Sequence, residues 1–301
     1  MRIESFIHPE LHIVEQVRAL ESVCQAHDHI AGALFLDPSL NVSPEIPCLL
    51  ALYEEDVLAG VMTLFAPSQE EVELVGLTHL DFRRRGVFRA LISAAAGQAR
   101  RFDIPDLLFV CQPQSRSGLA ALSSFDARLE HVEYSLRFQR TFSLDSLAVP
   151  EGLVLERATE AELDAMARIS AQSFAEEAEQ ALSFLKLAIH SDTRTQFLAR
   201  LSGEPVAIGA IGIADGEATI YGIGVLPRLQ GRGIGRGVIA LLLQEIRQRG
   251  IKEVCIEVNS KNEAALHLYQ SCGFVVASTY GYYRVPVVQL VQDRNCAQNF
   301  V

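Results

Sequence analysis

Tryptophan is absent from the chain of 301 residues, and aromatic residues make up only 7% of it. Proteins that bind single-stranded nucleic acids stack the bases on aromatic side chains, so this scarcity disfavours that class. Positive charge is also in deficit, because 26 Lys and Arg stand against 37 Asp and Glu, for a formal net charge of −11. Surfaces that bind nucleic acid or anionic membranes need an excess of positive charge. We therefore predict neither nucleic acid nor membrane as a partner.

Long apolar runs and a secretory leader are missing as well. A membrane-spanning helix needs roughly 20 apolar residues in succession, and a leader joins a basic start to an apolar stretch. The six cysteines are scattered and form no C-x-x-C pair. Disulfide frameworks are typical of short secreted chains rather than of one this long. We therefore expect reduced thiols and a cytoplasmic protein, and the spacing of the histidines predicts no metal site.

The apolar fraction of 49% and the length are sufficient for two domains. A short polar segment over 143–152 ends in Pro150 and Gly152, as linkers do. It divides two stretches in which apolar periodicity predicts a similar order of elements. In the first, helices are expected over 8–27, 86–101 and 117–129, and strands over 48–53, 57–65, 72–80, 107–111 and 132–142. In the second, helices are expected over 160–173, 176–189, 233–249 and 262–271, and strands over 153–157, 195–201, 205–213, 218–226, 253–258, 274–278 and 282–290.

The two stretches also match in detail. Arg83–Gly86 and Gln230–Gly233 both lie between an expected strand and an expected helix, and their positions differ by 147 residues. This match indicates a tandem duplication. We predict an α/β (α+β) fold with two domains, over residues 1–147 and 148–301.

The most informative segment is the turn that follows the strand expected over 218–226. Gly231, Gly233 and Gly235 open a helix there, accompanied by Arg232 and Arg236. The first amides of a helix are unpaired and carry the positive end of its dipole, and glycine lets a ligand approach them closely. The pattern predicts a pyrophosphate site. It is not a P-loop, because no Gly-Lys-Ser/Thr follows, and a dinucleotide turn would come after the first strand.

Two motifs identify a family at this point. The segment Gln230–Gly235 has the pattern Gln-x-x-Gly-x-Gly, and the segment Val258–Phe274 contains Asn-x-x-Ala followed by Leu-Tyr-x-x-x-Gly-Phe. In this order they resemble the signature of the GNAT superfamily of acyl-CoA N-acyltransferases. The resemblance covers about 153–290, and more weakly about 1–142. The two-copy arrangement is similar to that of the mycothiol synthases and related tandem members.

The resemblance implies the fold and the roles of individual residues. Each half would be a mixed, mostly antiparallel twisted sheet flanked by helices, with a splayed central strand pair. Acetyl-CoA would be the co-substrate, with its pantetheine arm against the backbone of Ile223 and Val225. Asn262 would bond the cofactor, and Tyr269 would protonate the leaving thiolate. The turn residues that would hold the cofactor are Gln230, Gly231, Arg232, Gly233, Ile234, Gly235 and Arg236.

The general base is less well defined by the sequence. Family members that use a carboxylate commonly carry a Glu early on the strand before the turn, and Thr219 stands at that position here. Glu217 lies two residues earlier, on the same face of a regular strand, and is the predicted base. Glu257 on the neighbouring strand is the alternative, and a chain of water molecules could also carry the proton.

The first copy departs from the pattern. Phe88 replaces the last small residue of the turn motif, and an offset of 144 residues aligns Gly118 with Asn262 and Phe125 with Tyr269. Phenylalanine cannot protonate a thiolate. We expect the first copy to be structural, to shape the substrate pocket, or to bind CoA without turnover.

Together these features predict an acetyl-CoA-dependent N-acetyltransferase. The C-terminal domain would transfer the acetyl group directly to a primary amine of a small molecule or an amino-acid-like substrate. The alternative is a non-catalytic CoA-binding sensor or interaction module, and a longer acyl group is a further option. A monomer or a homodimer is expected.

Overall fold

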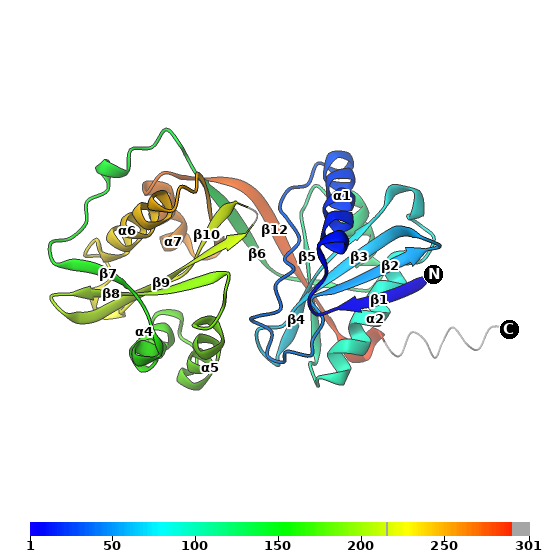
Figure 1. Ribbon diagram of the computed structural model, residues 1–301, viewed down its shortest axis with the longest axis horizontal. Helices are drawn as coiled ribbons and strands as arrows, with labels where there is room; N and C mark the ends of the chain where they lie inside the picture. The colour runs from blue at the N-terminus through cyan, green and yellow to red at the C-terminus, as the bar shows by residue number, and fades with distance from the viewer. Residues whose placement is uncertain (215, 291–301) are drawn as a thin grey trace. The chain divides into compact units, whose positions relative to one another are not determined.

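Figure 1 shows the computed structural model of the protein, which describes residues 1–214 and 216–290. The chain forms two compact units. Unit 1 contains residues 1–132 together with the segment that begins at Thr279, and unit 2 contains residues 133–278. In each unit, separate hydrophobic clusters lie on the two faces of a mixed sheet beneath helices.

Unit 1 has the strand order β1-β2-β3-β4-β5-β12. Neighbouring strands are antiparallel except for β4 and β5, which are parallel. Helix α1 covers one face of the sheet, and α2 covers the other. The elements are β1 (Arg2–Phe6), α1 (Leu11–Asp28), β2 (Leu49–Glu54), β3 (Val57–Phe65), β4 (Glu71–Thr78), η1 (Leu80–Phe82), α2 (Val87–Arg101), β5 (Asp106–Cys111), α3 (Arg116–Ser123) and the C-terminal part of β12 (Phe274–Pro286).

Unit 2 has the strand order β6-β11-β10-β9-β8-β7, and β10 and β11 are its parallel pair. Helices α4 and α5 cover one face of its sheet, and α6 and α7 cover the other (Figure 1). The elements are β6 (Arg128–Phe138), η2 (Leu144–Ser146), β7 (Leu153–Arg157), η3 (Glu160–Glu162), α4 (Leu163–Phe174), α5 (Ala178–Ala188), β8 (Arg194–Leu201), β9 (Glu204–Ala214), β10 (Glu217–Val225), η4 (Pro227–Leu229), α6 (Ile234–Gln248), β11 (Glu253–Asn259) and α7 (Glu263–Ser271).

Helix α6 positions the predicted turn, and its sequence explains how. Ile234, Val238, Leu242 and Ile246 recur at every fourth position and are all buried in the core of unit 2. Gly237 lies where α6 approaches β7, and a Cβ atom there would be 2.6 Å from a Leu153 methyl carbon. Burial of this stripe fixes the start of α6 against the end of β10.

Each unit is completed by a strand from the other half of the sequence. The part of β6 that begins at Glu133 belongs to unit 2, where it pairs with β11. The part of β12 that begins at Gly281 pairs with β5 and belongs to unit 1. In unit 1 the guanidinium of Arg284 on β12 is bound by three carboxylates, those of Glu71, Asp106 and Glu130. The observed units therefore differ from the expected division at residue 147, because a polar linker does not reveal which strands pair.

The exchange makes a testable prediction about fragments. A fragment of residues 133–278 contains all the strand pairs of unit 2 and is expected to fold alone. A fragment of residues 148–301 lacks β6, which leaves the edge of β11 unpaired, and we expect it to aggregate. Soluble yield and thermal unfolding followed by circular dichroism measure both. Equal stability of the two fragments would contradict the strand assignment.

The expected order of elements agrees with the structure in most places. β1 was not predicted, because its residues 2–6 include none that is fully buried and so show no core-facing pattern. The strands expected over 274–278 and 282–290 are one strand that ends at Pro286, and the helix expected over 117–129 ends at Ser123. The cysteines that the structure describes are free thiols. Cys296 lies outside the described residues.

Candidate active site

Strands β10 and β11 of unit 2 separate partway along their length. Their parallel ladder ends at the pair Ile220–Ile256, although β10 continues to Val225. A β-bulge between Tyr221 and Gly224 adds one residue to β10 relative to β9. Bulges redirect a strand and end its pairing, and they occur often beside active sites. The second half of β10 therefore lies at an open splay, where its backbone groups facing β11 are beyond the ladder.

Gly222 makes the bulge possible. Its φ of +56° lies in the left-handed region, which glycine enters without the steric cost that other residues incur. Ile223 and Val225, the two residues expected to face the pantetheine arm, follow directly and are partly exposed. The structure thus places both at the splay.

The connection from β10 to α6 forms a glycine-rich cradle. Gly231 and Gly233 have φ values of +75° and +79°, and Gly233 is the N-cap of α6. The amides of the first turn of α6 have no carbonyl partner within the helix. They also carry the positive end of the helix dipole. The cradle is therefore suited to an anion such as a pyrophosphate.

Several side chains of the turn have structural tasks. Gln230 donates its Nε2 hydrogen to the carbonyl oxygen of Val225 at 3.1 Å and so ties the turn to the end of β10. Arg236 donates to the Ser271 hydroxyl at 3.1 Å. Ile234 is buried, so only its backbone is available to a ligand. Arg232 is exposed beside the cradle, where its guanidinium can meet a phosphate.

Helix α7 supplies the two other predicted residues. Asn262 is its N-cap, and the side-chain oxygen accepts a hydrogen bond from the Ala265 amide at 3.1 Å. This bond leaves the Nδ2 group as the donor that could meet a ligand. Tyr269 is buried next to Phe274, with ring centroids 6.5 Å apart. Burial raises the pKa of the Tyr269 phenol to about 12, so it is protonated at neutral pH.

Tyr221 and Glu257 flank the mouth of the splay. Thr219 and Cys255 form a pair within the ladder, and the hydroxyl oxygen of Thr219 lies 3.1 Å from the sulfur of Cys255. Side chains alternate between the faces of a strand. Two residues further along, Tyr221 and Glu257 therefore project from the same face, just past the end of the ladder. The sequence named Glu257 as an alternative base, but it gave no signal for Tyr221, because an aromatic residue is common in any strand.

Glu257 has an altered affinity for protons. Its side chain is exposed to solvent, yet the surrounding protein withdraws enough water to raise the pKa of the carboxyl to about 7. The negative charges of Glu133 and Glu217 raise this pKa further, and Arg194 opposes them. A carboxyl with a pKa near 7 is suited to accept a proton at neutral pH.

Glu217 stands in a different setting. It is the first residue of β10 and pairs with Glu253 at the start of the ladder. Its carboxylate forms an ion pair with Arg137 at 2.9 Å. Four residues of strand, about 13 Å, separate it from Tyr221 at the mouth of the splay. The structure therefore gives Glu217 a charge partner and places it away from the splay.

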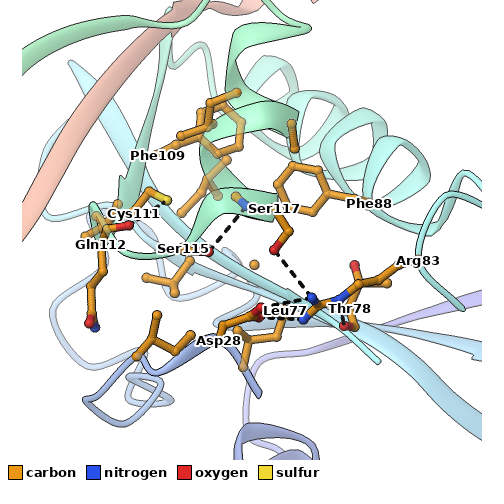
Figure 2. A pocket seen from close by; sticks show the side chains of 18 of the residues that line it. Asp28, Leu77, Thr78, Arg83, Phe88, Phe109, Cys111, Gln112, Ser115 and Ser117 are labelled. Carbon is orange, nitrogen blue, oxygen red and sulfur yellow. Dashed lines mark hydrogen bonds and ion pairs between the residues drawn. The ribbon is translucent and has the colours of Figure 1, made fainter. Parts of the chain in front are cut away.

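Unit 1 contains a cavity of about 720 Å³ at the corresponding place (Figure 2). The parallel ladder of β4 and β5 ends at the pair Leu74–Phe109, while β4 continues to Thr78. The cavity lies at this second splay and reaches Phe88 at the start of α2 and Ser117 in α3. A splayed strand pair is thus present in both units, as the resemblance implied.

Arg83 performs the same structural task in unit 1 as Gln230 in unit 2. It donates its Nε hydrogen to the Thr78 carbonyl oxygen at 3.2 Å. Its guanidinium also forms an ion pair with Asp28 at the wall of the cavity (Figure 2). The first residue of the turn motif therefore holds the turn against the strand in both copies.

Helix caps and strand pairs relate the two units residue by residue. The Ser115 side chain caps α3 as the Asn262 side chain caps α7, and these positions differ by 147 residues. The expected match of Gly118 with Asn262 and of Phe125 with Tyr269 is therefore wrong by three residues. The sequence did not reveal the cap of α3, because serine is common in loops as well as at helix starts.

The corrected correspondence shows what unit 1 lacks. The polar residues of the splay in unit 2 are replaced by aliphatic ones: Val75 stands at the position of Tyr221, Val110 at that of Glu257 and Leu122 at that of Tyr269. The pairing of β3 with β4 is also regular throughout, without the bulge seen in β10. Unit 1 keeps the splay and has aliphatic side chains at these three positions.

Phe88 fits into unit 1 because its strand neighbour is small. A Cβ atom on Gly76 would lie 2.6 Å from the Phe88 ring. The corresponding positions in unit 2 hold Ile223 on the strand and Gly235 on the helix. The large and small residues have changed places, so Phe88 occupies the space that a strand side chain fills in unit 2.

The described residues hold no group of three or more His, Cys, Asp or Glu side chains that could bind a metal ion. Within residues 1–214 and 216–290, no helix combines the length and the hydropathy that crossing a bilayer requires. Neither finding extends beyond these ranges.

Comparison with known proteins assigns the family. The model of the acetyltransferase (GNAT) family matches residues 163–274, and a relative 31% identical to the chain covers most of both sequences. The chain belongs to the GNAT family and is an N-acetyltransferase.

The relatives point to one branch of this family. A protein named mycothiol acetyltransferase from Thermobispora bispora is 31% identical over 247 residues, which are 75% of this chain and 79% of that protein. One from Thermomonospora curvata is 28% identical over 286 residues, 91% of this chain and 94% of that protein. A tandem GNAT protein from the clavulanic acid biosynthesis pathway has a similar structure, with a TM-score of 0.71 at 16% identity, covering 95% of this chain and 98% of that one.

Proposed function

We propose that unit 2 transfers the acetyl group of acetyl-CoA directly to the primary amine of a small molecule, with Tyr269 and Glu257 as its proton-transfer groups. The observation that carries the proposal is the comparison of the two splays. Unit 2 has Glu257 just past the ladder and Tyr269 on α7, whereas unit 1 has Val110 and Leu122 at the corresponding positions. A splayed strand pair thus occurs both with and without these two groups.

The residues of unit 2 fit acetyl-CoA. The pyrophosphate would lie on the amides at the start of α6, with Arg232 as a further donor. The pantetheine arm would run along the backbone of Ile223 and Val225, whose β11-facing edge lies beyond the ladder. The Nδ2 group of Asn262 would donate to the same arm. These assignments are supported by the edge of β10 beyond the ladder and by the positive φ values of Gly231 and Gly233 in the cradle.

The reaction requires three proton movements. An ammonium group has no lone pair, so the amine must first lose a proton, and the Glu257 carboxylate accepts it. The amine nitrogen then attacks the thioester carbonyl carbon, and backbone amides at the splay stabilise the negative charge on the carbonyl oxygen. The C–N bond forms and the C–S bond breaks. The departing thiolate takes the proton of the Tyr269 hydroxyl, and the nitrogen, which is positively charged after the attack, loses its second proton to water. Solvent then returns a proton to Tyr269.

Glu257 is a better candidate for the base than Glu217, the residue predicted from the sequence. Its pKa of about 7 leaves a substantial ionised fraction at neutral pH and gives that fraction a real affinity for a proton. It also lies at the mouth of the splay, whereas Glu217 is bound to Arg137 at the start of the ladder. Glu217 contributes its charge to the site rather than its basicity.

The acceptor is proposed by class. Relatives that match most of the chain are named mycothiol acetyltransferases, which favours a small-molecule amine. The negative charges of Glu133 and Glu217 act on Glu257, and negative charge attracts a cationic amine before it is deprotonated. We propose that the enzyme acts in the cytoplasm. The state of monomer or homodimer stays a prediction.

A second function is supported by the cavity of unit 1. This cavity of about 720 Å³ lies at a splay beside the start of α2. The N-cap of α2 is Gly86, which has a φ of +86°. We propose that this cavity holds the pantetheine arm of a second CoA molecule without turnover. Val110 and Leu122 stand where unit 2 has Glu257 and Tyr269, so unit 1 has no counterpart of the two groups proposed to transfer protons.

A calorimetric titration with acetyl-CoA tests both functions. The full chain is expected to bind two molecules. Gly235→Phe is expected to abolish the site in unit 2 and all turnover, because Ile223 fills the space that Gly76 leaves open in unit 1. Ser117→Trp, at an exposed position lining the cavity of unit 1, is expected to remove the other site and keep turnover. If the wild type binds only one molecule of acetyl-CoA and Gly235→Phe binds none, the second function is excluded. Full turnover in Gly235→Phe would contradict the first.

A further inference from the structure

Arg194 lies on the same face of the sheet of unit 2 as the proposed base. It is the first residue of β8 and pairs with Gly212 of β9, which in turn pairs with Thr219 of β10. Thr219 faces Cys255 across the ladder. This row of side chains leads across the sheet to the position just before the mouth of the splay.

The guanidinium of Arg194 is stacked on Tyr221. Its central carbon lies 4.0 Å from the centroid of the Tyr221 ring, a close cation–π contact. Gly212 provides the place for this ring, because a Cβ atom there would lie 2.7 Å from a Tyr221 ring carbon and 3.6 Å from the Cγ atom of Arg194. Any other residue at Gly212 would displace the ring. The stack therefore has three layers: glycine, phenol and guanidinium.

Groups from four strands face Glu257. They are Glu133 of β6, Arg194 of β8, Glu217 and Tyr221 of β10 and Cys255 of β11. The two carboxylates oppose the charged form of Glu257, and the guanidinium favours it. The stack on Tyr221 holds this positive charge beside Gly212, in the row of side chains just before the mouth of the splay.

We propose that Arg194 is a positioning residue of the active site, which holds the Tyr221 ring against Gly212 and places a positive charge on the face of the sheet that carries Glu257. The inference rests on the proposed role of Glu257 as the base. Arg194 itself touches neither the reacting atoms nor the proton, and it acts through its neighbours.

The consequence of losing Arg194 follows from the charges that remain. Without the guanidinium, Glu133 and Glu217 act on Glu257 unopposed, so the carboxyl binds its proton more tightly. A smaller fraction of the enzyme then carries a free base at neutral pH. The loss is recovered when the pH is raised above the new titration midpoint, because the base itself is unchanged.

The direct test is a titration of Glu257 by carbon NMR in protein labelled at the glutamate side-chain carboxyls. A difference spectrum against Glu257→Gln assigns the resonance. In Arg194→Gln the midpoint is expected to rise by roughly one pH unit. In Arg194→Lys, which keeps the charge and loses the planar stack, it is expected to rise less. Tyr221→Leu removes the ring on which the guanidinium stacks, and the midpoint of Glu257 is expected to rise in this variant too, by a smaller amount.

Arg200→Gln is the matched control. Arg200 lies on the same strand and the same face, but it forms an ion pair with Glu156 at 3.0 Å, so the titration of Glu257 is expected to stay unchanged. An unmoved midpoint in Arg194→Gln overturns the inference and leaves the proposed base intact. If the midpoint moves while Glu257→Gln keeps full activity with an amine acceptor, the proposed base fails instead, and the positioning role in catalysis fails with it.

Activity gives an independent check that a purely structural role would not satisfy. The ascending limb of the pH–rate profile with an amine acceptor is expected to move with the NMR midpoint in Arg194→Gln, and the rate is expected to recover at high pH. A rate lowered by the same factor at every pH would show that Arg194 serves folding or acceptor binding, and would overturn the inference.

Discussion

Replacing Tyr269 by phenylalanine, a loss of one oxygen atom, is expected to slow acetyl transfer about 100-fold to 10,000-fold. The leaving thiolate would then depart without its proton donor. The affinity for acetyl-CoA is expected to change little, because the predicted cofactor contacts lie on the backbone of β10 and α6. Steady-state kinetics combined with calorimetry separates the two effects. The variant keeps the ring that packs against Phe274, so its fold is expected to be intact.

Tyr53→Phe is the matched control for this variant. Tyr53 is as buried as Tyr269, at 6% against 7% exposed, and its hydroxyl donates to Gln16 in unit 1. Loss of this hydrogen bond is expected to cost about 1 kcal/mol of stability and no activity. Unchanged turnover in Tyr269→Phe would exclude the phenol as the acid.

Replacing Glu257 by glutamine is expected to abolish the rise of activity through neutral pH. In the wild type, kcat/KM for an amine acceptor should increase with pH and level off above about 7, where the carboxyl is ionised. Glu257→Gln cannot accept the proton and is expected to be at least roughly 100-fold slower at neutral pH. A pH–rate profile measured on both proteins tests this.

Glu217→Gln is the matched control for the base. It removes a carboxylate of the same kind, and its negative charge raises the pKa of Glu257. The ascending limb is therefore expected to move to lower pH in this variant while the maximal rate is kept. A large loss of maximal rate in Glu217→Gln, with Glu257→Gln nearly normal, would restore Glu217 as the base and overturn the assignment made here.

The raised pKa of Glu257 also has a consequence for stability. The folded state holds this proton up to a pH of about 7, whereas the unfolded state releases it near the ordinary value of 4.5. Stability therefore falls as the pH rises between these values and levels off above them. Glu257→Gln removes this dependence of folding stability on pH, and the variant is expected to be more stable than the wild type at neutral pH. Such an exchange of stability for activity is common at active sites.

The turn and the tandem repeat could be predicted from the sequence because both are local patterns. Three glycines at fixed spacing specify the backbone of the cradle, and two of them have the positive φ values that only glycine adopts readily. The helix stripe that begins at Ile234 is likewise a property of one segment. Features of this kind are determined by neighbours in the sequence.

The strand exchange could not be predicted, because pairing partners are distant in sequence. β12 pairs with β5 through residues such as Arg284 and Leu108, which are far apart in the chain. Nothing in the composition of either strand specifies this partner. For the same reason, the linker over 143–152 does not coincide with the limits of the two compact units.

The proton-transfer properties of the site also depend on distant residues. The pKa of Glu257 is raised by the surrounding protein, which withdraws water from the carboxyl, and by carboxylates on two other strands. The stack of Arg194 on Tyr221 exists because Gly212 lies beneath the ring. The sequence showed that Glu257 was available, but only the assembled sheet distinguishes it from Glu217.

In the proposed function, unit 2 catalyses acetyl transfer and unit 1 binds acetyl-CoA without turnover. The most direct measurement is thiol release from acetyl-CoA with a panel of amines, made on the double variant Glu257→Gln/Tyr269→Phe. Calorimetry on the same sample counts its binding sites. We predict two occupied sites and no amine-dependent release above background. Release at a rate comparable with the wild type, from a protein whose unit 2 lacks both groups, would contradict the proposed roles of Glu257 and Tyr269 and the division between the two units.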